Sequence, residues 1–248
     1  MKTVAVLIDF DNIFPKPINA YSSVDIQHVI DFAILTARAA IEDIGRFCIR
    51  LYGGWYENNS LTARASWVLS MLPLLNSAFP IITPPRSIIQ GSTELATQLF
   101  GHSFIWYNSY REHMGIPKLR VNHNAIGSLC MTNKTNCPVE ILKRFTEKKT
   151  KVCNASGCNT VHKDVFFERT QKYVDTMLAC DIITLSADND VAGIYVMSDD
   201  VDHFPAFAAA RDLNMSNAKM GLLITNVQNK SNYETLLSSF AIEVTVIQ

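Results

Sequence analysis

Five consecutive apolar residues, Val-Ala-Val-Leu-Ile at positions 4–8, restrict the fold of this chain more than any other feature. A short uninterrupted apolar run that is rich in β-branched residues is typical of a strand buried on both faces, as the central strands of parallel sheets are. Such a strand needs helices on both sides of its sheet. The run therefore favours an α/β fold.

Segments with the patterns of strands and helices alternate along the rest of the chain. We expect strands at 46–52, 119–122, 193–197, 220–225 and 242–247, and helices at 24–43, 61–76, 172–186, 204–213 and 233–239. This alternation predicts a three-layer α/β/α fold with a mostly parallel, doubly wound sheet. Prolines are expected to matter at two places: Pro73 should kink or end its helix, and three prolines should make residues 80–90 extended and irregular.

Length and composition are compatible with one large domain. The chain has 248 residues, of which 48% are hydrophobic, and single domains commonly reach about 250 residues. We therefore treat 1–248 as a single domain with a small insertion at 125–165, where four of the six cysteines lie. The apolar run before Asp9 is too short for a signal peptide, so we expect a cytoplasmic protein without a membrane span and with reduced or metal-bound cysteines.

Four aspartates follow two of the expected strands. Asp9 and Asp11 come after the first strand, and Asp200 and Asp202 come after the strand at 193–197. Ligands of open α/β sheets bind beyond the carboxyl ends of the strands. We therefore expect all four side chains at the same edge of the sheet.

Three further aspartates are divided between the two edges of the sheet. Asp175 lies near the start of an expected helix and should lean over the edge with the other four, whereas Asp188 and Asp190 precede a strand and should be turn residues at the opposite edge. Carboxylates that converge repel one another unless a cation neutralises them. Oxygen ligands suit Mg²⁺ or Mn²⁺, which also bind substrate phosphate and activate water. The sequence therefore predicts a Mg²⁺ or Mn²⁺ site.

Three short motifs occur in order along the chain. They are Ile8-Asp9-Phe10-Asp11-Asn12, Lys172-Tyr173-Val174-Asp175 with a trailing Asp181, and Ser198-Asp199-Asp200-Val201-Asp202 with Pro205. Together they resemble the motifs of the NYN domains, relatives of the PIN nucleases. The resemblance implies a PIN-like fold and metal-dependent RNA cleavage. It assigns metal ligation to Asp9, Asp175, Asp200 and Asp202, and to Asn12 the orientation of a ligand or of the substrate backbone.

Two residues depart from the pattern of that family. Asp199 stands where the family usually has Gly, and His203 stands where it usually has Phe. The extra charge of Asp199 is a candidate to perturb the metal site. His203, beside Asp202, is a candidate to approach the metal or a leaving group. The same departures favour the alternative of a catalytically degenerate RNA-binding module.

The segment 125–165 combines cysteines with basic side chains. Candidate ligands of a structural Zn²⁺ are Cys130, Cys137, Cys153 and Cys158, and the alternative is four free thiols in a loop. Candidate contacts with RNA phosphates are Lys143, Arg144, Lys148 and Lys149, together with Lys172 further along the chain; a solvated helix face is the alternative. Aromatic residues at 104–110 are candidates for base stacking or for the core.

These features predict a metal-dependent endoribonuclease that acts on single-stranded RNA, with single-stranded DNA as a further candidate substrate. The other enzymatic alternative is a haloacid-dehalogenase-type phosphatase. In that case Asp9 would attack phosphate and form an aspartyl-phosphate, and Asp11 would be the acid. A homo-oligomer is compatible with the sequence and is not required by it.

Overall fold

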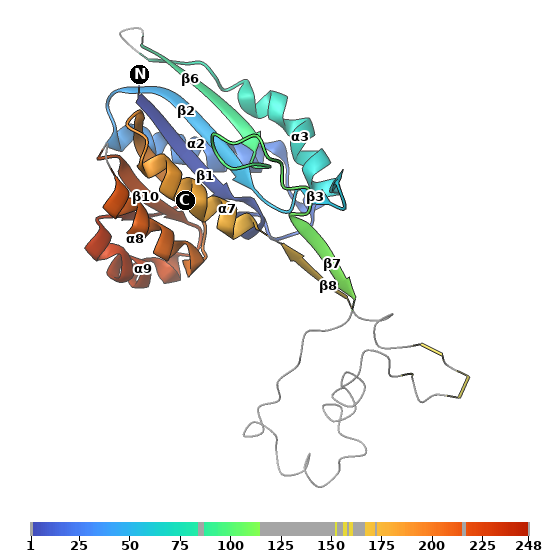
Figure 1. Cartoon of the computed structure of the whole chain (residues 1–248). Helices are drawn as coiled ribbons and strands as arrows, with labels where there is room; N and C mark the ends of the chain where they lie inside the picture. The colour runs from blue at the N-terminus through green and yellow to red at the C-terminus, as the bar shows by residue number, and fades with distance from the viewer. Residues whose placement is uncertain are drawn as a thin grey trace, which may run out of the picture. The chain divides into compact units, whose positions relative to one another are not determined.

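A seven-stranded sheet with the order β11-β10-β9-β1-β2-β6-β5 is the centre of the fold (Figure 1). The structure is a computed structural model that describes residues 2–83, 87–114, 152, 156–157, 159–160, 167–171, 173–214 and 217–247. Neighbouring strands are parallel throughout the sheet except for the antiparallel pair of β5 and β6. The strands of this sheet are β1 (Lys2–Asp9), β2 (Ile44–Tyr52), β5 (Ile81–Thr83), β6 (Ser87–Leu95), β9 (Val191–Met197), β10 (Lys219–Ile224) and β11 (Glu243–Val246).

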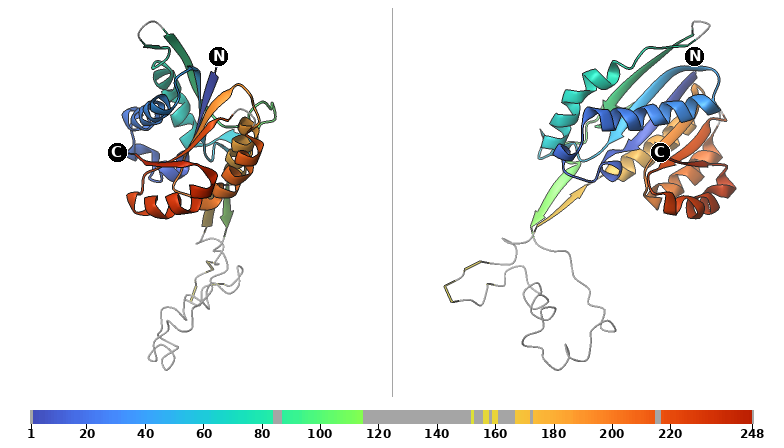
Figure 2. Two further views of the ribbon diagram at one scale, coloured as in Figure 1. Left: turned by 90° about the vertical axis from the view of Figure 1, so that its left-hand side faces the viewer. Right: turned by 180° about the vertical axis from the view of Figure 1, so that it is seen from behind.

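Helices cover both faces of the sheet (Figure 2). Within the described residues the α-helices are α1 (Phe10–Ile13), α2 (Ser23–Ala40), α3 (Ala63–Asn76), α7 (Val174–Ser186), α8 (Phe204–Leu213) and α9 (Lys230–Leu237). Alternate residues of β1 face opposite sides, as a strand requires. Val4, Val6 and Ile8 pack with α2 and α3, whereas Ala5 and Leu7 pack with α7, α8 and α9. The expected three-layer α/β arrangement with a mostly parallel sheet is therefore confirmed.

The apolar run at 4–8 is wholly buried, as its sequence predicted. Each of its five side chains is at most 1% exposed, because β1 has a strand on each side and helices above and below. Burying a side chain of this kind contributes about 1.5–3 kcal/mol. Asp9, the last residue of β1, lies at the carboxyl end of this central strand.

One expectation about proline was wrong in part, and the other is narrowed. Pro73 was expected to kink or end its helix, and α3 continues past it to Asn76, where the helix was expected to end. Residues 80–90 are more regular than we expected, because β5 and the first part of β6 form an antiparallel pair at the edge of the main sheet. Pro80 comes just before β5, so it removes no donor from that pair.

The chain divides into two compact units. One comprises 1–109 and 171–248 and holds the main sheet, and it also contains the short antiparallel pair of β3 (Tyr56–Glu57) and β4 (Ser60–Leu61). The other spans Tyr110–Thr170, where β7 (Tyr110–Met114) pairs with β8 (Phe167–Gln171) in a two-stranded sheet. The strand expected at 119–122 lies outside the described residues, as does most of the segment 125–165. In the part of the chain that the structure describes, no helix has the length and apolar character needed to cross a membrane.

Candidate metal centre

Asp9 is held in a buried position by the residue that follows the neighbouring strand. Its exposed fraction is 4%. The hydroxyl group of Ser198, which comes directly after β9, donates a hydrogen bond to Asp9 Oδ2 at 2.9 Å. The Ser198 hydroxyl oxygen also accepts the backbone N–H of Asp200 at 3.1 Å. Because that oxygen is already an acceptor, its own proton is left for the carboxylate, and the Asp9 side chain is fixed in orientation.

Asp175 reaches the same site from the first turn of α7. The helix begins after Tyr173, which has a left-handed backbone with φ of 68°. Val174 and Met177 pack into the core and fix the start of the helix against the sheet. The protein atoms around the Asp175 carboxyl group raise its pKa by desolvating it, the charge of Asp9 raises it further, and His203 lowers it. Burial is thus the main cause of the raised pKa of Asp175, and the negative charges nearby add to it.

His203 completes the group from a third segment of the chain. It is the last residue of the 3₁₀ helix η3 (Val201–His203), which leads directly into α8. Its exposed fraction is 1%, and neither ring nitrogen has a hydrogen-bond partner among the described residues. His203 Nε2 lies 3.6 Å from Asp9 Oδ2, which is too long for a good hydrogen bond.

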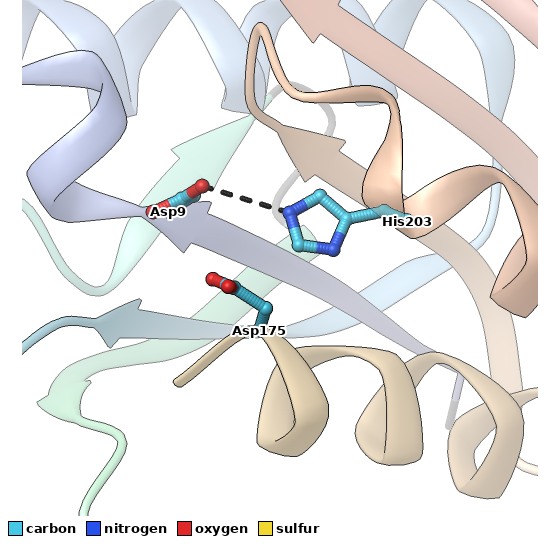
Figure 3. Close-up of side chains that lie close together, drawn as sticks. All are labelled: Asp9, Asp175 and His203. Atoms are coloured by element: carbon cyan, nitrogen blue, oxygen red, sulfur yellow. Dashed lines mark ion pairs between the residues drawn. The ribbon is translucent and has the colours of Figure 1, made fainter. Parts of the chain in front are cut away.

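Asp9, Asp175 and His203 form one cluster of potential metal ligands (Figure 3). Each offers one ligand atom, and these atoms all lie within 4.8 Å of one another. Two carboxylates that lie close together repel each other, and a buried imidazole whose nitrogens make no hydrogen bond costs about 1–3 kcal/mol. A divalent cation bound between the three side chains would relieve both penalties. The donor set therefore fits a metal ion.

Asp200 and Asp202 are near this cluster but do not belong to it. Asp200 Oδ1 accepts the backbone N–H of Asp202 at 3.0 Å and so caps η3, while the Asp202 side chain is exposed. Both carboxylates lie close enough to raise the pKa of Asp175. Metal ligation by Asp200 and Asp202 stays a prediction.

Asn12 and Asp199 tie together the loops that follow three neighbouring strands. Asn12 Oδ1 accepts the backbone N–H of Asp199 at 2.8 Å and links the end of β1 to the loop after β9. The Asp199 carboxylate accepts the backbone N–H groups of Thr225 and Asn226, at 3.0 and 3.1 Å, and also the Thr225 hydroxyl. The charge of Asp199 is therefore used in a contact with the loop after β10.

Asp11, the acid of the phosphatase alternative, is engaged elsewhere. Its carboxylate pairs with Arg64 Nε at 2.6 Å and accepts the backbone N–H of Gly54 at 2.9 Å. Burial raises the pKa of Asp11, while the charge of Arg64 and the hydrogen bond from Gly54 lower it. These contacts fix α1 to the loop after β2.

Several predicted site residues lie outside the described residues. They are the candidate zinc ligands Cys130, Cys137, Cys153 and Cys158, and the candidate RNA contacts Lys143, Arg144, Lys148, Lys149 and Lys172. Asp188 and Asp190 are exposed turn residues between α7 and β9, where Asp188 accepts the backbone N–H of Asp190. They lie at the edge opposite to Asp9, as expected.

The aromatic residues near position 104 are divided between exposed and partly buried positions. The exposed fraction of Phe104 is 66% and that of Tyr107 is 43%. The Trp106 ring lies between Phe104 and Tyr173, with centroid distances of 5.1 and 5.2 Å. Tyr173 is itself exposed and comes two residues before Asp175.

A buried ion network that the sequence analysis missed fixes α7 to the sheet. Asp181, the trailing aspartate of the second motif, is fully buried and accepts hydrogen bonds from the Arg50 guanidinium, the Tyr52 hydroxyl and the backbone N–H of Phe100. Arg50 also donates to Glu94 at 2.8 Å. An arginine within the apolar strand at 46–52 was the available sign, because a buried charge needs a partner.

A scan against protein-family models, a search of curated proteins and a search of solved structures each found no match for this chain.

Proposed function

We propose that this chain is a metal-dependent phosphodiester hydrolase that cleaves single-stranded RNA, built on a PIN-like fold. The observation that carries the proposal is the cluster of Asp9, Asp175 and His203 at the carboxyl ends of parallel strands. Ligand sites of open α/β sheets lie at this edge. The three motifs that resemble NYN domains supply two of the three residues.

The residues of the cluster would hold the cation and set the charge around it. Asp9 is oriented by Ser198, and Asp175 is presented by the first turn of α7. A divalent cation held there would activate a water molecule and neutralise the charge that develops on the phosphate during in-line attack. Asp200 and Asp202, which stay outside the cluster, add negative charge that attracts a cation to this edge.

The phosphatase alternative receives less support from the contacts of Asp11. An aspartate that protonates a leaving group must face the substrate beside the nucleophile. Instead, the Asp11 carboxylate is held by Arg64 and by the backbone of Gly54. The degenerate RNA-binding alternative differs from the proposal only in whether cleavage occurs, so an assay must separate them.

The test incubates the purified full chain with end-labelled single-stranded RNA in Mn²⁺ or Mg²⁺, with EDTA as a control. We expect cleavage that EDTA abolishes and that Asp9→Asn and Asp175→Asn reduce to background. Asp188→Asn is the matched control, because it removes an exposed aspartate at the opposite edge and should leave the rate unchanged. Circular dichroism checks that each variant is folded.

Two other outcomes would contradict the proposal, and each favours a different alternative. RNA binding without cleavage by any divalent cation would favour the binding module. Hydrolysis of small phosphate monoesters that Asp9→Asn abolishes, with RNA left intact, would favour the phosphatase.

A further inference from the structure

We infer that the imidazole of His203 is a metal ligand and makes the site selective for a first-row transition-metal cation of the Mn²⁺ class over Mg²⁺. This inference rests on the metal-binding part of the proposed function and not on RNA cleavage. The His203 ring is 1% exposed and has no hydrogen-bond partner on either nitrogen among the described residues.

The backbone around His203 leaves the ring little freedom to turn away. Asp200 caps η3 through the N–H of Asp202, and Pro205, two residues after the histidine, stands in the first turn of α8. Phe204, which directly follows the histidine, packs edge-on against Tyr233 at a centroid distance of 5.2 Å. These contacts fix the backbone of His203 at this edge, and its buried ring lies beside Asp9 and Asp175.

A simple ion pair with Asp9 does not account for this geometry. The separation between His203 Nε2 and Asp9 Oδ2 is 3.6 Å, which is long for a charge-assisted hydrogen bond, usually about 2.7–2.9 Å. That Asp9 oxygen already accepts the Ser198 hydroxyl at 2.9 Å. An imidazole nitrogen and two carboxylate oxygens within 4.8 Å of one another surround a space in which one cation can contact all three.

The chemistry of the donors decides which cation is favoured. Mg²⁺ is a hard cation that prefers oxygen ligands and keeps several of its waters. Imidazole nitrogen suits transition metals, whose affinity for mixed nitrogen and oxygen sites rises along the series from Mn²⁺. A site made of carboxylates alone would lack this preference. A histidine nitrogen in place of one oxygen donor therefore raises the affinity for Mn²⁺ relative to that for Mg²⁺.

The test measures metal binding directly on the full chain after treatment with a chelator. Calorimetric titration with Mn²⁺ and with Mg²⁺ gives the affinity ratio, and pulsed electron paramagnetic resonance of bound Mn²⁺ detects coupling to a ligand nitrogen. Mn²⁺ is a better probe than Zn²⁺, because the cysteines of the segment 125–165 would compete for Zn²⁺. We expect Mn²⁺ to bind at least about tenfold more tightly than Mg²⁺, together with a nitrogen signal.

Two variants of His203 and one control assign the effect to this residue. His203→Gln keeps an oxygen donor, so it should lose the nitrogen coupling and lower the Mn²⁺-to-Mg²⁺ affinity ratio by about tenfold or more while Mg²⁺ still binds. His203→Phe removes the donor and should weaken Mn²⁺ further. His102→Gln removes an exposed histidine outside the cluster and should change neither quantity. Circular dichroism identifies any variant that fails to fold, and His203→Gln remains informative if His203→Phe does.

Equal affinity for the two cations without nitrogen coupling would overturn the inference, even if RNA is cleaved. Selective Mn²⁺ binding with a His203-dependent nitrogen signal would support it, even if no RNA is cleaved. The two proposals therefore fail separately.

Discussion

Replacing Asp181 tests whether the buried ion network holds the helix that presents Asp175. Asp181 is fully buried, and the side chain of its partner Arg50 is 3% exposed. The substitution Asp181→Ala leaves a guanidinium without its deepest partner and also leaves the Tyr52 hydroxyl without its acceptor. The remaining partner of the guanidinium in the ion network, Glu94, has a side chain that is half exposed.

The expected loss of stability in Asp181→Ala follows from the burial of Asp181 and Arg50. Removing one member of a buried ion pair typically costs about 3–5 kcal/mol, and the buried Arg50 would keep only the half-exposed Glu94 and the backbone carbonyl of Gln98 as partners. A chain of this size loses about 2–4 °C in melting temperature for each kcal/mol, so we expect Asp181→Ala to melt about 6–20 °C lower. Natural domains are stable by only about 5–15 kcal/mol, so the variant should fold but be fragile.

The assay is urea unfolding followed by circular dichroism, with two comparison variants. Glu94→Gln alters the exposed partner and should cost less than about 1 kcal/mol. The double variant Arg50→Met with Asp181→Leu removes both buried charges and should recover at least half of the loss, because no unpaired charge remains. If Asp181→Ala were no more destabilising than Glu94→Gln, the network would not hold α7 and the reasoning would be refuted.

Three further predictions concern the site and its surroundings. Ser198→Ala removes the hydrogen bond that orients the Asp9 carboxylate and should weaken Mn²⁺ binding, measured by calorimetry, by about 10–100-fold. Unchanged affinity would contradict the positioning role of Ser198. Asp199→Ala loses the contacts with the loop after β10, so it should lower the free energy of unfolding in urea by about 1–2 kcal/mol and change the Mn²⁺ affinity little. A large loss of Mn²⁺ affinity would instead put Asp199 in the metal site. Burial raises the pKa of the Cys48 thiol from 9.0 to about 11, so the folded state holds this proton more tightly and stability should fall as pH rises from 9.0 to 11. The fall should be on the order of 2 kcal/mol smaller in Cys48→Ala, and identical alkaline profiles would refute the assignment.

The central strands and most of the helices were predictable, because burial on both faces leaves a strong signal in sequence; β5 and β6 were not predicted. The run at 4–8 and the segment at 193–197 both became central strands, and Asp9 lies where the first run predicted. Residues 80–90 were harder to predict. Their prolines suggested an irregular segment, but the hairpin of β5 and β6 leaves Pro80 before its first strand and keeps the pairing at the edge of the sheet.

The residues of the cluster were only partly predictable, because the side-chain directions after β9 depend on the local backbone. The sequence analysis expected Asp200 and Asp202 to reach the same edge as Asp9, because both follow the strand at 193–197. The chain instead turns into the 3₁₀ helix η3, which has about three residues per turn, and His203 is buried while Asp202 is exposed. Only the structure fixes where such a turn begins.

The three residues of the cluster come from segments far apart in the chain, and this affects when the proposed metal centre can form. Asp9 lies 189 positions before Ser198, which orients it, and His203 comes later still. Parallel pairing across such a distance is slow compared with the formation of local contacts. A chain still on the ribosome carries Asp9 long before β9 and η3 are made, so an unfinished or proteolysed copy has no complete centre. Metal binding would then report that the chain has been synthesised and folded at least as far as η3.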